Sequence, residues 1–314
     1  MQHRVAHPTP VLALFGPTAA GKSALAHAAA AQLGGEIVVA DPFQRYRGLE
    51  IAADAPSAAE RADVRYHFVG DLGLDESSSA GAFGAAAHAV VDEIIGRDRL
   101  VVVTGGTALY LRAALTELGF PPPVPAETRL WAETLVTTDL VAARDELARR
   151  DPEAAHRVDL ANPRRLARAL ELAALPERAD GPTDRLWDGS MRRPTWLAAI
   201  TRPRAELDRL IALRVRRELD DGLVPELERA LAMPGISREA RQIIGAREVA
   251  SVHAGEISAT ELPDLLAART RRLARRQLSW MRRWPDAAEI DLGTRPASAA
   301  LPELLARWRT DAAR

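Results

Sequence analysis

Residues Gly16-Pro17-Thr18-Ala19-Ala20-Gly21-Lys22-Ser23 decide the fold of this chain. They fit the pattern G-x-x-x-x-G-K-[ST] of a phosphate-binding loop. The apolar run Val11–Phe15 before them predicts a buried strand, and the Ala- and Leu-rich run Lys22–Leu33 predicts a helix. A glycine-rich loop between a strand and a helix presents backbone amides and a helix N-terminus to an anion. The sequence therefore predicts a bound diphosphate or triphosphate.

Lysine occurs once in this chain, at Lys22, and the other residues among the 42 lysines and arginines are all arginine. Genomic GC bias accounts for the arginines. A compact ammonium kept inside a phosphate loop indicates that Lys22 meets terminal phosphate oxygens, with Ser23 as the expected Mg²⁺ ligand. Kinases, NTPases and enzymes with a diphosphate leaving group share such loops, so the loop alone does not choose the reaction.

Apolar strands and helices alternate after this loop. We expect strands at Glu36–Ala40, Tyr66–Val69 and Leu100–Thr104 and a helix at Ala82–Ile95. This order predicts an α/β fold, a P-loop NTPase-like parallel sheet flanked by helices. Because open sheets bind ligands at the carboxyl ends of their strands, Asp41 after the second strand is the acid best placed for chemistry.

The pattern changes at the prolines of residues 121–125, and long helical Ala, Leu and Arg patterns follow. We expect a helical insertion at 121–194 inside a core made of residues 1–120 and 195–314. Trp196–Ile200 is the expected last strand of the sheet. The C-terminal helices are expected at Glu206–Asp221, Ser237–Val252 and Glu261–Arg283, with Gly222 as the cap of the first.

Composition excludes several kinds of chemistry. The chain has no cysteine, which rules out disulfides, cysteine-bound metals and thiol nucleophiles. The first ten residues lack the apolar core of a signal peptide, and no apolar run approaches the roughly 18 residues of a membrane span. We therefore expect a cytoplasmic monomer without a membrane partner.

Arginine clusters within a chain of net charge -1 are candidate nucleic-acid contacts. The segment Arg269–Arg283 interleaves seven arginines with Trp280, and Trp284 follows it, a mixture suited to phosphates and stacked bases. Arg164, Arg165 and Arg168 form a second cluster. On charge alone, a solvated arginine-rich face explains these runs equally well.

The motifs together resemble the family of tRNA dimethylallyltransferases. The likeness starts with the phosphate loop and nearly spans the chain. Its further motifs are Asp41 with Gln44, Tyr46, Arg47 and Gly48; Gly105-Gly106-Thr107-x-Leu109-Tyr110; Asn162-Pro163-Arg164-Arg165 with Arg168-Ala169-Leu170-Glu171; Arg214-Val215 before Gly222-Leu223; and Arg276-Gln277-Leu278-x-Trp280. The chain departs from the family pattern at Pro42, at Ala52–Pro56 and at Ala246.

The resemblance implies transfer of a dimethylallyl group from its diphosphate to the exocyclic amine of the adenosine 3′ of the anticodon. Asp41 is the implied general base, because this amine is a poor nucleophile until its proton is removed. Lys22, the loop amides, Mg²⁺ on Ser23 and Arg214 would stabilise the departing diphosphate. Thr107 resembles the threonine that positions the substrate near the base.

The resemblance also implies contacts to the tRNA anticodon stem-loop, whose adenosine must leave its stack to react. These residues are Asp41, Pro42, Phe43, Gln44, Thr107, Arg129, Arg164, Arg165, Leu166, Ala167, Arg168, Gln242, Gly245, Arg247, Arg276 and Gln277.

Other interpretations stay open on the residues alone. Asp41 is also a plausible turn cap, Arg214 a solvated helix residue, and Thr107 a helix N-cap. A prenyltransferase acting on free adenine nucleotide, a small-molecule kinase with ATP in the loop, and a non-catalytic RNA-binding protein are the competing functions.

Overall fold

The computed structural model describes residues 9–120, 124–175 and 190–311. They form two compact units, a core unit (Met1–Leu118 with Leu186–Arg314) and an insertion unit (Gly119–Arg185). Arg192 and Arg193 both pair with Asp92 in the core unit, so the insertion ends before residue 194, where the sequence analysis placed its boundary.

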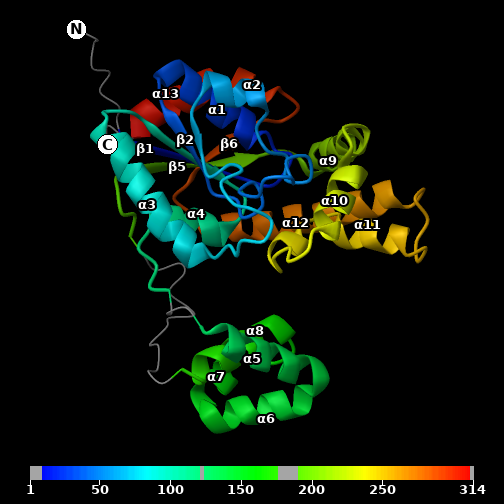
Figure 1. The fold of residues 1–314 in the computed structure, drawn as a ribbon. Helices are drawn as coiled ribbons and strands as arrows, with labels where there is room; N and C mark the ends of the chain where they lie inside the picture. The colour runs from blue at the N-terminus through cyan, green and yellow to red at the C-terminus, as the bar shows by residue number, and fades with distance from the viewer. Residues whose placement is uncertain (1–8, 121–123, 176–189, 312–314) are drawn as a thin grey trace. The chain divides into compact units, whose positions relative to one another are not determined.

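A parallel sheet organises the core unit, with strand order β3-β2-β4-β1-β5-β6 among the described residues (Figure 1). The P-loop NTPase-like α/β prediction is confirmed. The strands are β1 (Val11–Phe15), β2 (Glu36–Val39), β3 (Tyr66–His67), β4 (Val101–Gly105), β5 (Thr195–Thr201) and β6 (Ala288–Asp291). The prediction that β5 would be the last strand is wrong, because β6 pairs with it on its outer side.

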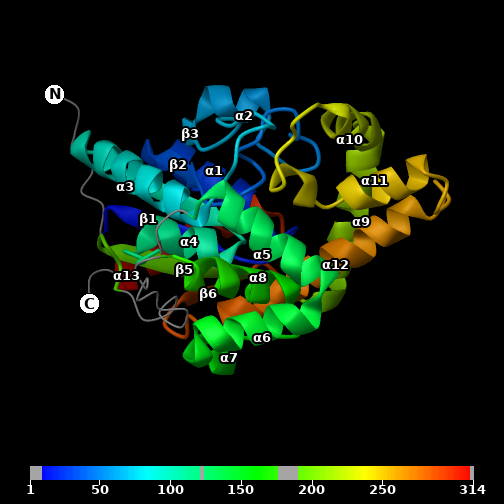
Figure 2. The same ribbon diagram turned by 60° about the horizontal axis from the view of Figure 1, so that its bottom comes forward.

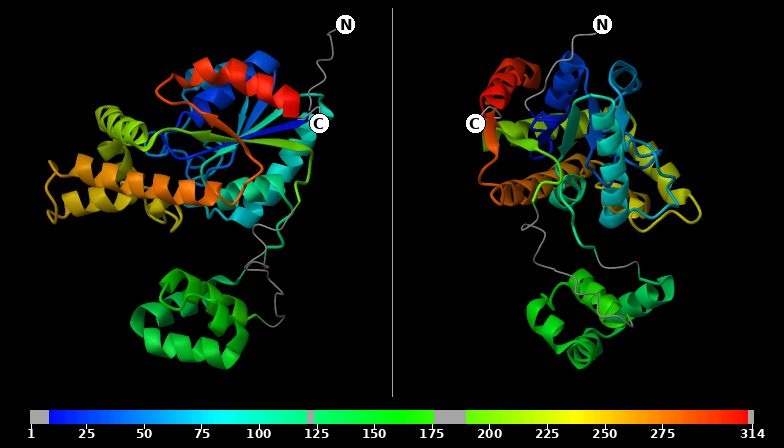
Figure 3. Two further views of the ribbon diagram at one scale, coloured as in Figure 1. Left: turned by 180° about the vertical axis from the view of Figure 1, so that it is seen from behind. Right: turned by 90° about the vertical axis from the view of Figure 1, so that its left-hand side faces the viewer.

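Alternate residues of each strand enter two different hydrophobic layers, since successive side chains point to opposite faces of a sheet. Leu12 and Leu14 pack toward α1 and α13, whereas Val11, Ala13 and Phe15 pack toward α3 and α4. Helices cover both faces of the sheet (Figure 3). The helices of the core unit are α1 (Lys22–Leu33), α2 (Ala58–Asp63), α3 (Ala80–Gly96), α4 (Ala108–Leu115), α9 (Arg204–Asp220), α10 (Leu223–Ala232), α11 (Ala246–His253), α12 (Leu262–Met281) and α13 (Leu301–Asp311).

The helix predicted at Ser237–Val252 is wrong as a single element. A short 3-10 turn, Ala240–Gln242, comes first, and α11 begins only at Ala246. Gly245 separates them with φ 102°, a left-handed conformation that a continuing helix does not allow. Gly222 occupies a similar place between α9 and α10, with φ 100°.

The described residues of the insertion unit form four helices (Figure 2). These helices enclose a small hydrophobic core of their own. The helices are α5 (Ala126–Thr138), α6 (Leu140–Arg150), α7 (Pro152–Arg157) and α8 (Pro163–Ala173). Asp139, Asp151 and Asn162 cap the N-termini of α6, α7 and α8 through their side-chain oxygens. Across both units, no helix of the described residues has the length and apolarity to cross a membrane.

Candidate active site

The phosphate-binding loop follows β1 and leads directly into α1, which begins at Lys22. Gly21 takes φ 97°, which lets the chain turn into the helix without the strain that a side chain would add. A Cβ on Gly16 would lie 2.5 Å from the carbonyl oxygen of Ile200 on β5. Both glycines of the motif are therefore needed by the backbone path.

Gln277 on α12 fixes the middle of this loop. The backbone N–H of Thr18 donates to Gln277 Oε1 at 2.7 Å, and both residues are buried. The side-chain amide of Gln277 also occupies the space beside Gly106, where a Cβ would lie 2.2 Å from its nitrogen. Gln277 thus joins α12, the phosphate loop and the end of β4; its predicted contact with RNA stays a prediction.

Arg214 reaches the same loop from α9. Its Nη1 donates to the hydroxyl of Thr18 at 2.8 Å, and its Nε donates to Glu218 at 2.6 Å. A second carboxylate, that of Asp54, lies 3.0 Å from Nη1 and also pairs with Arg217. Burial disfavours the charge on Arg214, but Asp54 and Glu218 outweigh it and raise its pKa. The structure therefore places Arg214 beside the phosphate loop, not in solvent.

Asp41 lies two residues after the end of β2, at the carboxyl edge of the sheet. Its Oδ1 accepts the backbone N–H of Phe43 at 2.9 Å and that of Gln44 at 3.4 Å. Asp41 therefore does cap a turn, as the alternative interpretation held. The same carboxylate also lines a large cavity. Burial raises the pKa of Asp41, although the N–H of Phe43 and the charge of Lys22 oppose the shift.

Lys22 lies in a region of mixed charge. Burial lowers its pKa and the neighbouring Arg214 lowers it further, while Asp41 and Asp54 act in the opposite direction. A diphosphate between Lys22 and Arg214 would relieve the repulsion between these two cations, because an anion favours both charged forms.

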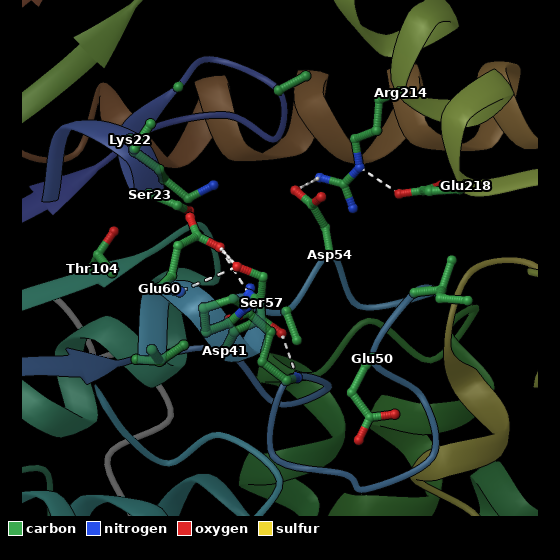
Figure 4. A pocket seen from close by; sticks show the side chains of 18 of the residues that line it. Lys22, Ser23, Asp41, Glu50, Asp54, Ser57, Glu60, Thr104, Arg214 and Glu218 are labelled. Carbon is green, nitrogen blue, oxygen red and sulfur yellow. Dashed lines mark hydrogen bonds and ion pairs between the residues drawn. The ribbon is translucent and has the colours of Figure 1, made fainter. Parts of the chain in front are cut away.

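A cavity of about 820 Å³ joins these groups in the core unit. Figure 4 shows Lys22 and Ser23 on one wall, Arg214 with Asp54 on another, and Asp41 below them. The carboxyl ends of β2 and β4, the segment 54–61 with the start of α2, and α9 complete the walls. Such a volume accommodates a diphosphate and an organic group together.

Ser23 offers a hydroxyl to a metal ion in the first turn of α1, where the helix N-terminus and the loop amides favour an anion. No cluster of three or more acidic or histidine side chains that could hold a metal occurs within the described ranges. The residues therefore fit Mg²⁺ only as a partner of the diphosphate, whose oxygens would complete its coordination.

Thr107 and Thr104 show how the end of β4 is arranged. Thr107 occupies the N-cap position of α4, but its side chain accepts no capping hydrogen bond in the described structure. Thr104 lines the cavity, and its buried Oγ1 has no hydrogen-bond partner among the described residues. Sequence reasoning passed over Thr104, and its only signal was a polar residue at the end of an apolar strand.

The residues predicted to contact tRNA fall in both units. In the insertion unit Arg164 and Arg165 are exposed at the start of α8, and Arg168 pairs with Glu171. Leu166 and Ala167 are buried in the core of that unit, so their side chains stabilise α8 and do not present a contact surface.

A second cavity, of about 330 Å³, lies in the core unit between α11 and α12. Arginines from both helices line it, which brings together two residues that the sequence analysis named separately, Arg247 and Arg276. Arg269 and Arg272 join them, and Glu248 pairs with Arg269. Such a concentration of guanidinium groups suits phosphate oxygens.

The fold and the cavity of about 820 Å³ define a P-loop α/β enzyme whose phosphate loop lies beside the half-buried carboxylate of Asp41. The profile of the IPP transferase family matches residues 44–284, and the chain belongs to this family. A tRNA dimethylallyltransferase of Salinispora arenicola is 40% identical over 285 residues, which are 90% of this chain and 82% of that protein. One from Corynebacterium jeikeium is 34% identical over 297 residues, covering 92% of this chain and 95% of the relative.

Solved structures agree with the sequence relatives. The tRNA isopentenylpyrophosphate transferase of Bacillus halodurans matches with a TM-score of 0.67 at 27% identity, covering 97% of this chain and 99% of its own. A eukaryotic dimethylallyltransferase acting on tRNA has a TM-score of 0.75 and covers 96% of this chain and 77% of its own, but at 20% identity it shows the fold alone.

Proposed function

We propose that this protein transfers a dimethylallyl group from dimethylallyl diphosphate to the exocyclic amine of an adenosine in tRNA, the one 3′ of the anticodon. The observation that carries the proposal is the single cavity that places Asp41 across from the phosphate loop and Arg214. The names and extent of the relatives support the same acceptor and donor.

The reaction breaks the allylic carbon–oxygen bond and forms a carbon–nitrogen bond to the adenosine. The carbon–oxygen electron pair leaves with the diphosphate, whose growing charge is met by Lys22 and by the amides at the start of α1. The amine proton goes to the carboxylate of Asp41, whose raised pKa makes it a stronger base than an exposed aspartate. Mg²⁺ held at Ser23, when bound, would supply further charge for the leaving group.

The acceptor would be bound by the arginines of both units. The cavity between α11 and α12 offers four guanidinium groups, and the exposed Arg164 and Arg165 offer two more at the N-terminus of α8. We expect the enzyme to act on its tRNA acceptor in the cytoplasm, and to act as a monomer.

The test is a transfer assay with purified protein, Mg²⁺ and labelled dimethylallyl diphosphate. Total tRNA and AMP are supplied in parallel as acceptors, and products are digested to nucleosides for mass analysis. Prenylated adenosine from tRNA alone is the expected result. Product from AMP alone would identify the free-nucleotide enzyme, and no product from either would contradict the proposal.

A further inference from the structure

Asp54 is an acidic residue in a place where an anion is expected to bind. Its carboxylate lies 3.0 Å from Nη1 of Arg214, and this same nitrogen donates to Thr18 of the phosphate loop. Asp54 lines the large cavity together with Lys22 and Ser23 (Figure 4). It therefore shares an arginine with the loop that binds the diphosphate.

Hydrogen bonds to α10 anchor the loop that carries Asp54. The backbone N–H groups of Ile51 and Ala52 donate to the carboxylate of Glu226 at 3.0 Å and 2.9 Å. Glu226 is itself buried, on α10. Asp54 has φ 49°, the left-handed region that aspartate and asparagine tolerate better than most residues. Its position is thus set by the fold and not by the ion pair alone.

Arg214 does not need Asp54 in order to stay beside the loop. Glu218, one turn along α9, accepts from its Nε at 2.6 Å, and the Thr18 hydroxyl accepts from Nη1. Two carboxylates around one guanidinium already balance its charge, so a diphosphate meets an arginine whose positive potential is largely cancelled. The side chain of Asp54 is 36% exposed, more than the 11% of Glu218, so it is the carboxylate with more freedom to withdraw.

We propose that Asp54 competes with the diphosphate for Arg214, giving up the arginine when substrate binds and taking it back when product diphosphate leaves. This inference rests on the proposed function, since it needs a diphosphate in the cavity. Asp54 therefore weakens the binding of both the substrate and the product diphosphate. The enzyme gains faster release of the product diphosphate, whose high charge would otherwise keep it bound in the cavity.

The test measures binding of inorganic diphosphate, with Mg²⁺, to the full chain by titration calorimetry. Asp54→Asn keeps the shape of the side chain and its tolerance of a positive φ, and Asp54→Gly serves as a second variant because glycine also adopts this conformation. Asp208→Asn is the matched control, a carboxylate on α9 that is not among the residues lining the cavity and whose ion-pair partners, Arg271 and Arg204, lie 3.6 Å and 3.9 Å away.

Both Asp54 variants are expected to bind diphosphate about tenfold more tightly, equivalent to about 1.4 kcal/mol, while Asp208→Asn stays within about twofold of the original chain. Equal or weaker binding by both Asp54 variants would overturn the inference, and so would an equal gain in the control. If the unaltered chain and Asp54→Asn both fail to bind diphosphate, the proposed function fails, and the inference fails with it.

Discussion

Replacing Gln277 with leucine tests whether α12 stabilises the phosphate loop. The side chain is buried, and its Oε1 accepts the buried N–H of Thr18 at 2.7 Å. Leucine has a similar volume but no acceptor, so the N–H is left buried without a partner, which costs about 1–3 kcal/mol. We expect the free energy of unfolding, measured by urea titration, to fall by this amount.

The same variant should bind diphosphate more weakly in the absence of RNA, because an unfixed Thr18 no longer holds the loop amides in one conformation. Gln32→Leu is the control, the same change at an exposed position on α1, expected to shift stability by less than about 0.5 kcal/mol. Unchanged stability and diphosphate affinity in Gln277→Leu would refute the reasoning.

Three further changes test the site. Asp41→Asn keeps the turn with Phe43 and should retain tRNA binding in a gel-shift assay while losing transfer; normal turnover would exclude Asp41 as the base. In the unaltered enzyme the ionised form of Asp41 is the active one and burial raises its pKa, so kcat/KM should fall as pH drops through that raised value, and a flat profile would argue against this role. Lys22→Ala should raise the KM for dimethylallyl diphosphate and leave tRNA affinity unchanged, whereas loss of tRNA affinity alone would contradict its place in the diphosphate cradle. Thr104→Val removes a buried hydroxyl that has no partner in the described structure and should raise the free energy of unfolding by about 1 kcal/mol; a decrease in urea titrations would mean that the hydroxyl is bonded.

The sequence predicted the parts of the fold that local patterns control. An apolar run predicts the strand Val11–Phe15, and the spacing of two glycines predicts the phosphate loop. Helical periodicity predicts α1, which has the predicted bounds. The strand β6 (Ala288–Asp291) was missed because only Ile290 is buried in it, so its four residues carry no apolar run. Its place in the sheet depends on pairing with β5, a contact distant in sequence.

The site shows the same division. Lys22 and Asp41 could be named because a motif or a strand end marks them. Asp54 could not be named from the sequence, because no motif near it indicates that this loop residue pairs with Arg214, 160 positions further along the chain. The resemblance named Gln277 as an RNA contact, but it did not reveal that helical periodicity turns this side chain inward while Arg276 faces solvent.

The two core segments that flank the insertion unit in sequence pair with each other. Thr116 bridges to Met191, and the N–H of Arg192 donates to the carbonyl of Leu115. The sheet on either side of this point is completed by strands from both halves of the chain, with β1 paired to both β4 and β5. A tight hairpin in place of the residues between Thr116 and Met191 would therefore leave the catalytic sheet intact, because all of its described strands lie outside that segment.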